Sequence, residues 1–94
     1  MANPITGKVL DFITNEDISG ARVFALKGIM VAGKAWSKSD GSYEIENELA
    51  ADDDCILLGI KSGYNPVNTS YAQLSDTGPV EADPLYLIKK TDYL

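Results

Sequence analysis

The sequence predicts an all-β protein, a seven-stranded antiparallel β-sandwich, on three observations. No window of a dozen residues repeats apolar side chains at helical spacing between two capping residues. Several short runs instead alternate apolar and polar residues with a period of two, which is typical of half-buried strands. Turn-forming residues separate these runs, as expected for two packed antiparallel sheets.

The predicted strands are short and are spread along the whole chain. They cover residues 5–11, 21–26, 31–37, 42–46, 55–60, 67–70 and 85–88. In the first strand, Lys8 is expected on the face opposite Val9. The predicted inner face of that strand carries Ile5, Gly7, Val9 and Asp11.

A hairpin is predicted at Asp40-Gly41, because glycine supplies the positive φ that a tight turn needs. Beyond this turn, Tyr43 and Ile45 are expected to face the core. Glu44 and Glu46 are expected to face water.

The second half of the chain contains a nearly continuous apolar strand, residues 55–60. This composition predicts a central strand that is covered on both faces. Residues 63–66 are expected to interrupt the sheet, and the stretches 47–54 and 71–79 are interpreted as loops.

Composition limits the class of protein. The 94 residues suffice for one domain, 1–94, and the single cysteine, Cys55, forms no internal disulfide. With a net charge of −6, the surface lacks the basic character that nucleic acids and anionic membranes require. No apolar run approaches the length of a membrane span, and residues 1–4 do not resemble the start of a secretory signal. Because the chain has no histidine, nucleophilic triads and catalytic zinc sites lose their usual base or ligand.

Four segments occur in an order that resembles the carboxypeptidase regulatory-like domains. They are residues 5–11 (ITGKVLD), 18–23 (ISGARV), 39–45 (SDGSYEI) and 61–64 (KSGY). The resemblance implies the seven-stranded Greek-key sandwich called transthyretin-like or prealbumin-like. It also implies an accessory module without catalytic activity, in proteins of the cell surface or the secreted space.

Within this resemblance, the glycines have structural explanations. Gly7 suits a bulge or a close contact between backbones, because it lacks Cβ. Gly20-Ala21 leaves room where the second strand enters the core, and Gly63 turns the chain before Tyr64. Hydroxyisourate hydrolases resemble transthyretin but use histidines and a C-terminal Tyr-Arg-Gly-Ser motif, whereas this chain ends Lys-Thr-Asp-Tyr-Leu.

A protein-contact site is the first candidate for function. The apolar residues Ile29, Met30 and Val31 lie between two glycines, either on an edge strand or loop that suits protein contact or on a buried strand without such a role. Trp36 follows on the same predicted strand. The candidate interaction residues are therefore Ile29, Met30, Val31 and Trp36.

Ligand sites are the second candidate. Asp52, Asp53 and Asp54 form a candidate Ca²⁺ site, with the alternative that they only keep a loop solvated. The aromatic residues that sugar rings would stack on are Trp36, Tyr64, Tyr71 and Tyr93, with the alternative that they complete the core.

The function expected from the sequence is a non-catalytic structural or protein-interaction module, with no cofactor other than the candidate Ca²⁺. Its partner is expected to be another protein or a second copy of the chain. A carbohydrate- or calcium-binding module and a stand-alone assembly subunit of a particle or appendage are the alternatives.

Overall fold

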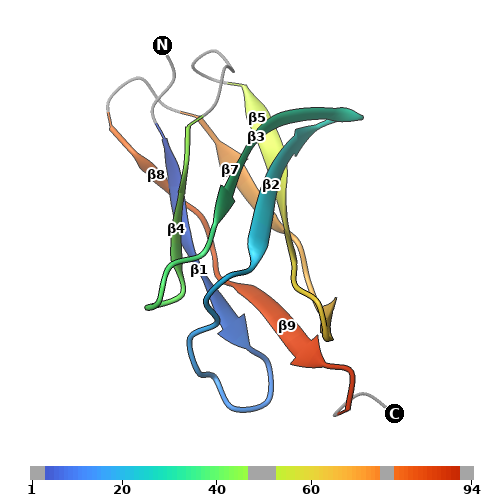
Figure 1. Cartoon of the computed structure of the whole chain (residues 1–94). Coiled ribbons are helices and arrows are strands. Elements are labelled where there is room, and N and C mark those ends of the chain that lie inside the picture. Colours follow the sequence, from blue (N-terminus) through green and yellow to red (C-terminus); the bar gives the residue numbers. More distant parts are fainter. Residues whose placement is uncertain (1–3, 47–52, 75–77, 92–94) are drawn as a thin grey trace.

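The computed structural model describes residues 4–46, 53–74 and 78–91, and within these ranges the chain is all β (Figure 1). The strands are β1 Ile5–Asp11, β2 Arg22–Lys27, β3 Met30–Trp36, β4 Ser42–Ile45, β5 Asp54–Ile60, β6 Tyr64–Pro66, β7 Ser70–Gln73, β8 Val80–Glu81 and β9 Leu85–Lys89. The all-β prediction is confirmed. The described ranges hold nine strands, however, where the sequence predicted seven.

The strands form two sheets, seen side by side in Figure 1. The first sheet has the order β4-β1-β9-β6, with β8 also paired to β1, and the second has the order β3-β2-β5-β7. The pairs β1–β8 and β1–β9 are parallel, so the prediction of purely antiparallel pairing is wrong at β1. Parallel pairing arises here because most of the chain, rather than a tight turn, connects these strands.

One cluster of buried side chains lies between the sheets. Its members on the paired strands are Ile5, Val9, Val23, Ala25, Tyr43, Ile45, Cys55, Leu57, Ala72, Leu85 and Leu87. In β1 and β4 the burial alternates residue by residue, as predicted: Tyr43 and Ile45 are buried, and Lys8 points away from Val9. Period-two reasoning succeeds in these strands because one face of each packs on the core and the other is more open to water.

Glycine allows close packing where β1 meets β4. Gly7 is paired with Tyr43, and a Cβ at Gly7 would lie 2.6 Å from Cζ of the tyrosine ring. The close neighbour of Gly7 is thus a side chain and not the backbone that was expected, and the β1–β4 register has no bulge there.

The Asp40-Gly41 turn forms with Gly41 at φ 78°, but the hairpin prediction is wrong. The turn follows β3 of one sheet and leads into β4 of the other. Local sequence sets the turn conformation, whereas the strand that β4 pairs with is set by packing far along the chain.

Strand β5 is central in its sheet, between β2 and β7, but the prediction that both of its faces are covered is wrong. Cys55, Leu57 and Gly59 are buried. Ile56 and Ile60 are 48% and 47% exposed, because no further layer of the described chain covers that face.

The region that follows β5 also differs from the prediction. Residues 64–66 form edge strand β6 rather than a break, and Pro66 is tolerated at a sheet edge because its missing N–H is not needed for a second partner. Strand β7 covers residues 70–73, so the strand predicted at 67–70 begins later than expected and the first part of the loop predicted at 71–79 is a strand. Residues 75–77 of that predicted loop lie outside the described residues. The predicted loop at 47–54 lies largely outside the described residues; Asp54 itself begins β5.

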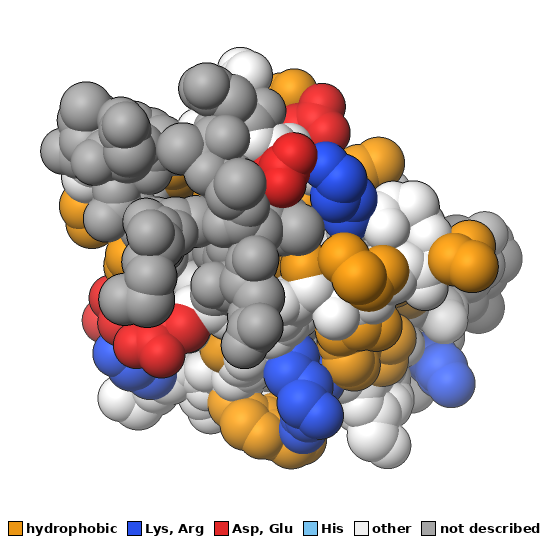
Figure 2. Space-filling view, turned by 90° about the horizontal axis from the view of Figure 1, so that it is seen from above, with side chains coloured by type: hydrophobic (Ala, Val, Ile, Leu, Met, Phe, Trp, Pro, Cys, Tyr) orange, Lys and Arg blue, Asp and Glu red, His pale blue; other side chains and the backbone are white. Residues whose placement is uncertain are grey.

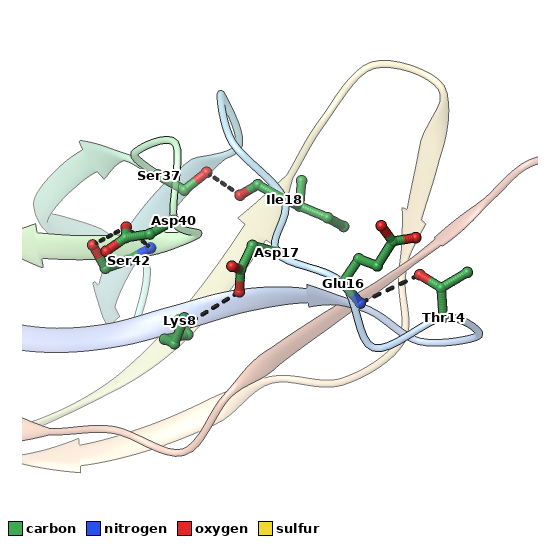
Figure 3. A network of polar contacts seen from close by, with 8 residues as sticks. All are labelled: Lys8, Thr14, Glu16, Asp17, Ile18, Ser37, Asp40 and Ser42. Carbon is green, nitrogen blue, oxygen red and sulfur yellow. Dashed lines mark hydrogen bonds and ion pairs between the residues drawn. The ribbon is translucent and has the colours of Figure 1, made fainter.

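Polar contacts hold the loop between β1 and β2 against the rest of the molecule (Figure 3). Lys8 and Asp17 form an ion pair of 2.8 Å across this region. The buried Ser37 hydroxyl donates to the carbonyl oxygen of Ile18 at 2.7 Å and accepts from the Ala21 N–H at 2.9 Å. The entry into β2 is therefore tied to the end of β3.

Candidate functional site

The four residues predicted for protein contact lie on β3 and on the turn that precedes it. Gly28 has φ 62° and opens the two-residue connection between β2 and β3, which leaves Ile29 fully exposed at its tip. Met30 and Val31 are each 52% exposed, and β3 is an edge strand of its sheet. The edge-strand alternative is therefore confirmed, and the buried alternative is wrong.

Val31 and Trp36 belong to a larger surface, the outer face of the sheet β3-β2-β5-β7, which we call the apolar face. Its apolar members are Phe24, Leu26, Val31, Trp36, Ile56, Leu58, Ile60 and Tyr71. Its polar members are Arg22, Lys34, Asp54 and Gln73. Seen from above in Figure 2, hydrophobic side chains reach the surface of the molecule beside Lys and Arg side chains.

The strand register places these side chains in rows across the sheet, since directly opposed residues of antiparallel strands share a face. One row is Trp36, Arg22 and Ile60. The next is Lys34, Phe24 and Leu58. The third is Val31, Leu26, Ile56 and Tyr71. Asp54 and Gln73 form a fourth row at the opposite end from Arg22.

A β-bulge lets β3 keep contributing to this face. The pairing with β2 shifts between Ala25 and Leu26, so that Gly33 opposes Ala25 and Val31 opposes Leu26. The extra residue, Ala32, reverses the alternation of β3 and turns Val31 outward.

On the apolar face, the guanidinium of Arg22 contacts two aromatic rings. Its guanidinium carbon lies 4.4 Å from the centre of the Trp36 ring and 5.8 Å from that of Phe24, both within cation–π range. Its Nε has no hydrogen-bond partner in the described part of the chain. Because this Nε is buried, a carboxylate from a partner would bind the outer nitrogens of the guanidinium.

The acidic end of the face has polar contacts of a different kind. The Tyr71 hydroxyl donates to the Asp54 carboxylate at 3.0 Å, and this hydrogen bond raises the pKa of Tyr71. Lys27 forms an ion pair with Asp53 at 2.7 Å, which raises the pKa of Lys27.

These contacts bear on the candidate Ca²⁺ site. Asp53 and Asp54 are engaged by different partners, a lysine and a tyrosine, while Asp52 lies outside the described residues. Across residues 4–46, 53–74 and 78–91, no three acidic or cysteine side chains meet in a way that would hold a metal ion. The geometry gives the candidate site no support.

The aromatic candidates for sugar stacking are divided between the sheets. Trp36 and Tyr71 are 59% and 60% exposed on the apolar face, at its two opposite edges. Three strand spacings of about 4.8 Å separate those edges. Tyr64 is half-buried on β6 in the other sheet, and Tyr93 lies outside the described residues.

A second apolar patch, which the sequence analysis did not single out, lies on the first sheet. Phe12 and Val67 are 52% and 41% exposed. With Asn65, Pro66 and Ile88 they line a depression of about 560 Å³. It contains no charged side chain and offers little chemistry beyond apolar contact.

No protein-family model matches the chain, and no curated protein matches its sequence. The part of the chain that the structure describes contains no helix suited to crossing a membrane. The proposal for the function therefore rests on the geometry of the apolar face.

Proposed function

We propose that this chain is a non-catalytic protein-interaction module, and that the apolar face is its contact surface. The observation that carries the proposal is one continuous sheet face with eight apolar side chains. Five of them are exposed, Val31, Trp36, Ile56, Ile60 and Tyr71, and the other three are half-buried. A soluble monomer rarely leaves a large contiguous apolar patch open to water, and such patches mark interaction sites.

The composition of the face supports protein contact in particular. Tryptophan, tyrosine and arginine are the residues that most often dominate the binding energy of protein interfaces. Trp36, Arg22 and Tyr71 all lie on this face, and strand backbones rather than loops hold them in place.

We further propose that the module is of the carboxypeptidase regulatory-like, transthyretin-like type, an accessory domain of a surface or secreted protein. The positions of the shared glycines support this. Gly20, Gly41 and Gly63 have φ values of 73°, 78° and 85°, and Gly7 packs under Tyr43. Each glycine of the resemblance therefore has a structural task, as expected for a scaffold. The absence of histidine from the chain agrees with a non-catalytic role.

Site-specific photo-crosslinking tests the interaction proposal. A benzophenone amino acid placed at Tyr71 reports on the apolar face, and the same group at Glu44, exposed on the other sheet, is the matched control. In extract of the producing cells, we expect discrete adducts from position 71 and none above background from position 44. Equal adducts from both positions, or none from position 71, would contradict the proposal.

Two exposed aromatic rings on one face favour carbohydrate binding as the second candidate function. Stacking of a sugar on Trp36 would change the emission of the only tryptophan in the chain. Saturable changes in this emission with an oligosaccharide, together with a calorimetric binding signal that Trp36→Ala abolishes, would establish this alternative. No change across a panel of glycans would exclude those sugars as ligands.

A further inference from the structure

The charges on the apolar face are arranged so that the face is complementary to itself. Arg22 lies in the first row and Asp54 in the fourth, at opposite ends of the sheet. These two residues lie on β2 and β5, which are neighbouring strands about 4.8 Å apart. The apolar rows lie between them.

From this arrangement we propose that the occupant of the apolar face is a second copy of the chain. The two β3-β2-β5-β7 sheets would pack face to face about a two-fold axis that runs across the strands. The inference rests on the proposed function and names the partner of the same surface.

The two-fold geometry brings opposite charges together twice. Rotation about an axis across the strands exchanges the first row with the fourth, so Arg22 of each copy faces Asp54 of the other. The lateral offset is one strand, and in this contact the guanidinium of Arg22 turns from the Trp36 ring on β3 toward β5. Its outer nitrogens, rather than the buried Nε, then donate to the carboxylate. An axis along the strands would instead keep the two Arg22 residues in the same row, one strand apart and far from Asp54, which like-charge repulsion opposes.

The remaining charged groups tolerate this contact. Lys34 lies on edge strand β3, where a long side chain can reach water past the interface. Lys27 and Asp53 neutralise each other in their own copy. The Tyr71 hydrogen bond uses one oxygen of Asp54 and leaves its other oxygen available.

The area of the apolar face determines how strongly we expect two copies to associate. Four strands spaced by about 4.8 Å and seven residues rising about 3.4 Å each give a projected area of roughly 450 Å² per copy. Stable interfaces bury about 800 Å² per partner. The dimer should therefore be weak, with dissociation in the micromolar range or above, and aligned sheets about 10 Å apart.

Charge reversal with a mixing experiment tests the proposal. Sedimentation equilibrium of the purified chain should show a concentration-dependent rise from 10.1 kDa toward twice that mass. Arg22→Glu and Asp54→Lys should each weaken self-association at least tenfold, because each places two like-charge pairs in the dimer. Glu44→Lys, a similar charge change on the other sheet, should have little effect.

The mixture of the two reversed variants is the decisive sample. A two-fold contact restores both pairs in the mixed dimer, so association should return when Arg22→Glu and Asp54→Lys are combined. Circular dichroism of each variant confirms that it is folded. Failure of the mixture to associate while the wild type dimerises would overturn this geometry.

The crosslinking experiment separates the two proposals. Purified chain carrying the benzophenone at position 71 should give an adduct of twice the monomer mass. A purified chain that stays monomeric at millimolar concentration, but gives adducts with other molecules in extract, would overturn the dimer and leave the interaction function standing. Absence of adducts in both samples would overturn both.

Discussion

The ring of Tyr43 lies over Gly7, its directly opposed residue on the neighbouring strand β1. A Cβ at position 7 would lie 2.6 Å from Cζ and 2.8 Å from Cε2 of that ring, and in closer conflict still with the hydroxyl oxygen. Tyr43 is among the largest fully buried side chains, so it has little room to move away. The glycine in the first strand is therefore a requirement of the core.

We expect Gly7→Ala to lower the free energy of unfolding by about 1–3 kcal/mol, the usual cost of overpacking a core. Urea denaturation measures the loss. The Tyr43 hydroxyl has no hydrogen-bond partner in the described residues, so Tyr43→Phe should be neutral or slightly stabilising. It should also reduce the cost of Gly7→Ala. Strict additivity of the two substitutions would show that the ring and the glycine are not coupled.

Ser37 supports the entry into β2 through two buried hydrogen bonds, to Ala21 and Ile18. In Ser37→Ala, the Ala21 N–H loses an acceptor and the Ile18 carbonyl loses a donor. An unsatisfied buried group costs about 1–3 kcal/mol, and we expect a loss in that range by urea denaturation. Ser42→Ala is the control, since its hydrogen bond to Asp40 is exposed and its cost should stay within about 0.5 kcal/mol. Equal effects of the two variants would contradict this role for Ser37.

Sequence patterns predicted the inner faces of β1 and β4 because apolar and polar residues alternate there. The pattern failed at β5, where every residue from Cys55 to Ile60 is apolar or glycine and no alternation can be seen. Whether the second face of β5 is buried therefore depends on what covers the sheet, and the residues of the strand do not show this. Turn chemistry correctly placed Gly41 at positive φ, but which strand β4 pairs with is a non-local outcome.

The candidate site was predicted at its edge and missed at its centre. Val31 and Trp36 were found because glycines and an isolated tryptophan are visible in the sequence. Arg22 and Ile56 join them only through the register of β2 with its neighbours, which no local pattern encodes. One signal was available: β2 alternates Val23 and Ala25 with Phe24 and Leu26, so both of its faces are apolar.

Asp11 makes the stability of the loop after β1 dependent on pH. Its carboxylate accepts the N–H of Thr14 at 3.0 Å and that of Ile13 at 2.8 Å. These hydrogen bonds, the Thr14 bond first, lower the pKa of Asp11 in the folded protein. The contribution is therefore complete above the unfolded pKa of about 3.9 and is lost as the pH falls through the lower folded value.

Asp11→Asn should cost about 1 kcal/mol at neutral pH, because neutral acceptors bond more weakly than charged ones. The difference from the wild type should shrink as the pH falls below about 4. Asp40 also has a lowered pKa, through Ser42, but it titrates in both proteins and cancels in the comparison. Urea denaturation at several pH values measures this difference. A constant difference at all pH values would show that the charge of Asp11 makes no contribution.

Adjacent residues of β5 should differ sharply in their importance for stability. Leu57 is fully buried, and Leu57→Ala should cost about 2–5 kcal/mol. Ile56 is 48% exposed on the apolar face, and Ile56→Ala should cost less than about 1 kcal/mol in the monomer. Denaturation at low protein concentration excludes any contribution from association. Similar losses at both positions would mean that the outer face of β5 is covered within the monomer.

Arg22 and Trp36 should be coupled in a way that fluorescence detects. The guanidinium lies 4.4 Å from the ring centre and shields one side of the only tryptophan. Arg22→Ala should increase quenching of Trp36 by acrylamide and lower the free energy of unfolding by about 0.5–1 kcal/mol, the usual value of an exposed cation–π contact. Lys34→Ala removes a positive charge from the same face without removing this stacking contact, so it should leave the quenching nearly unchanged. If both variants changed the quenching equally, charge rather than contact with Arg22 would govern the environment of Trp36.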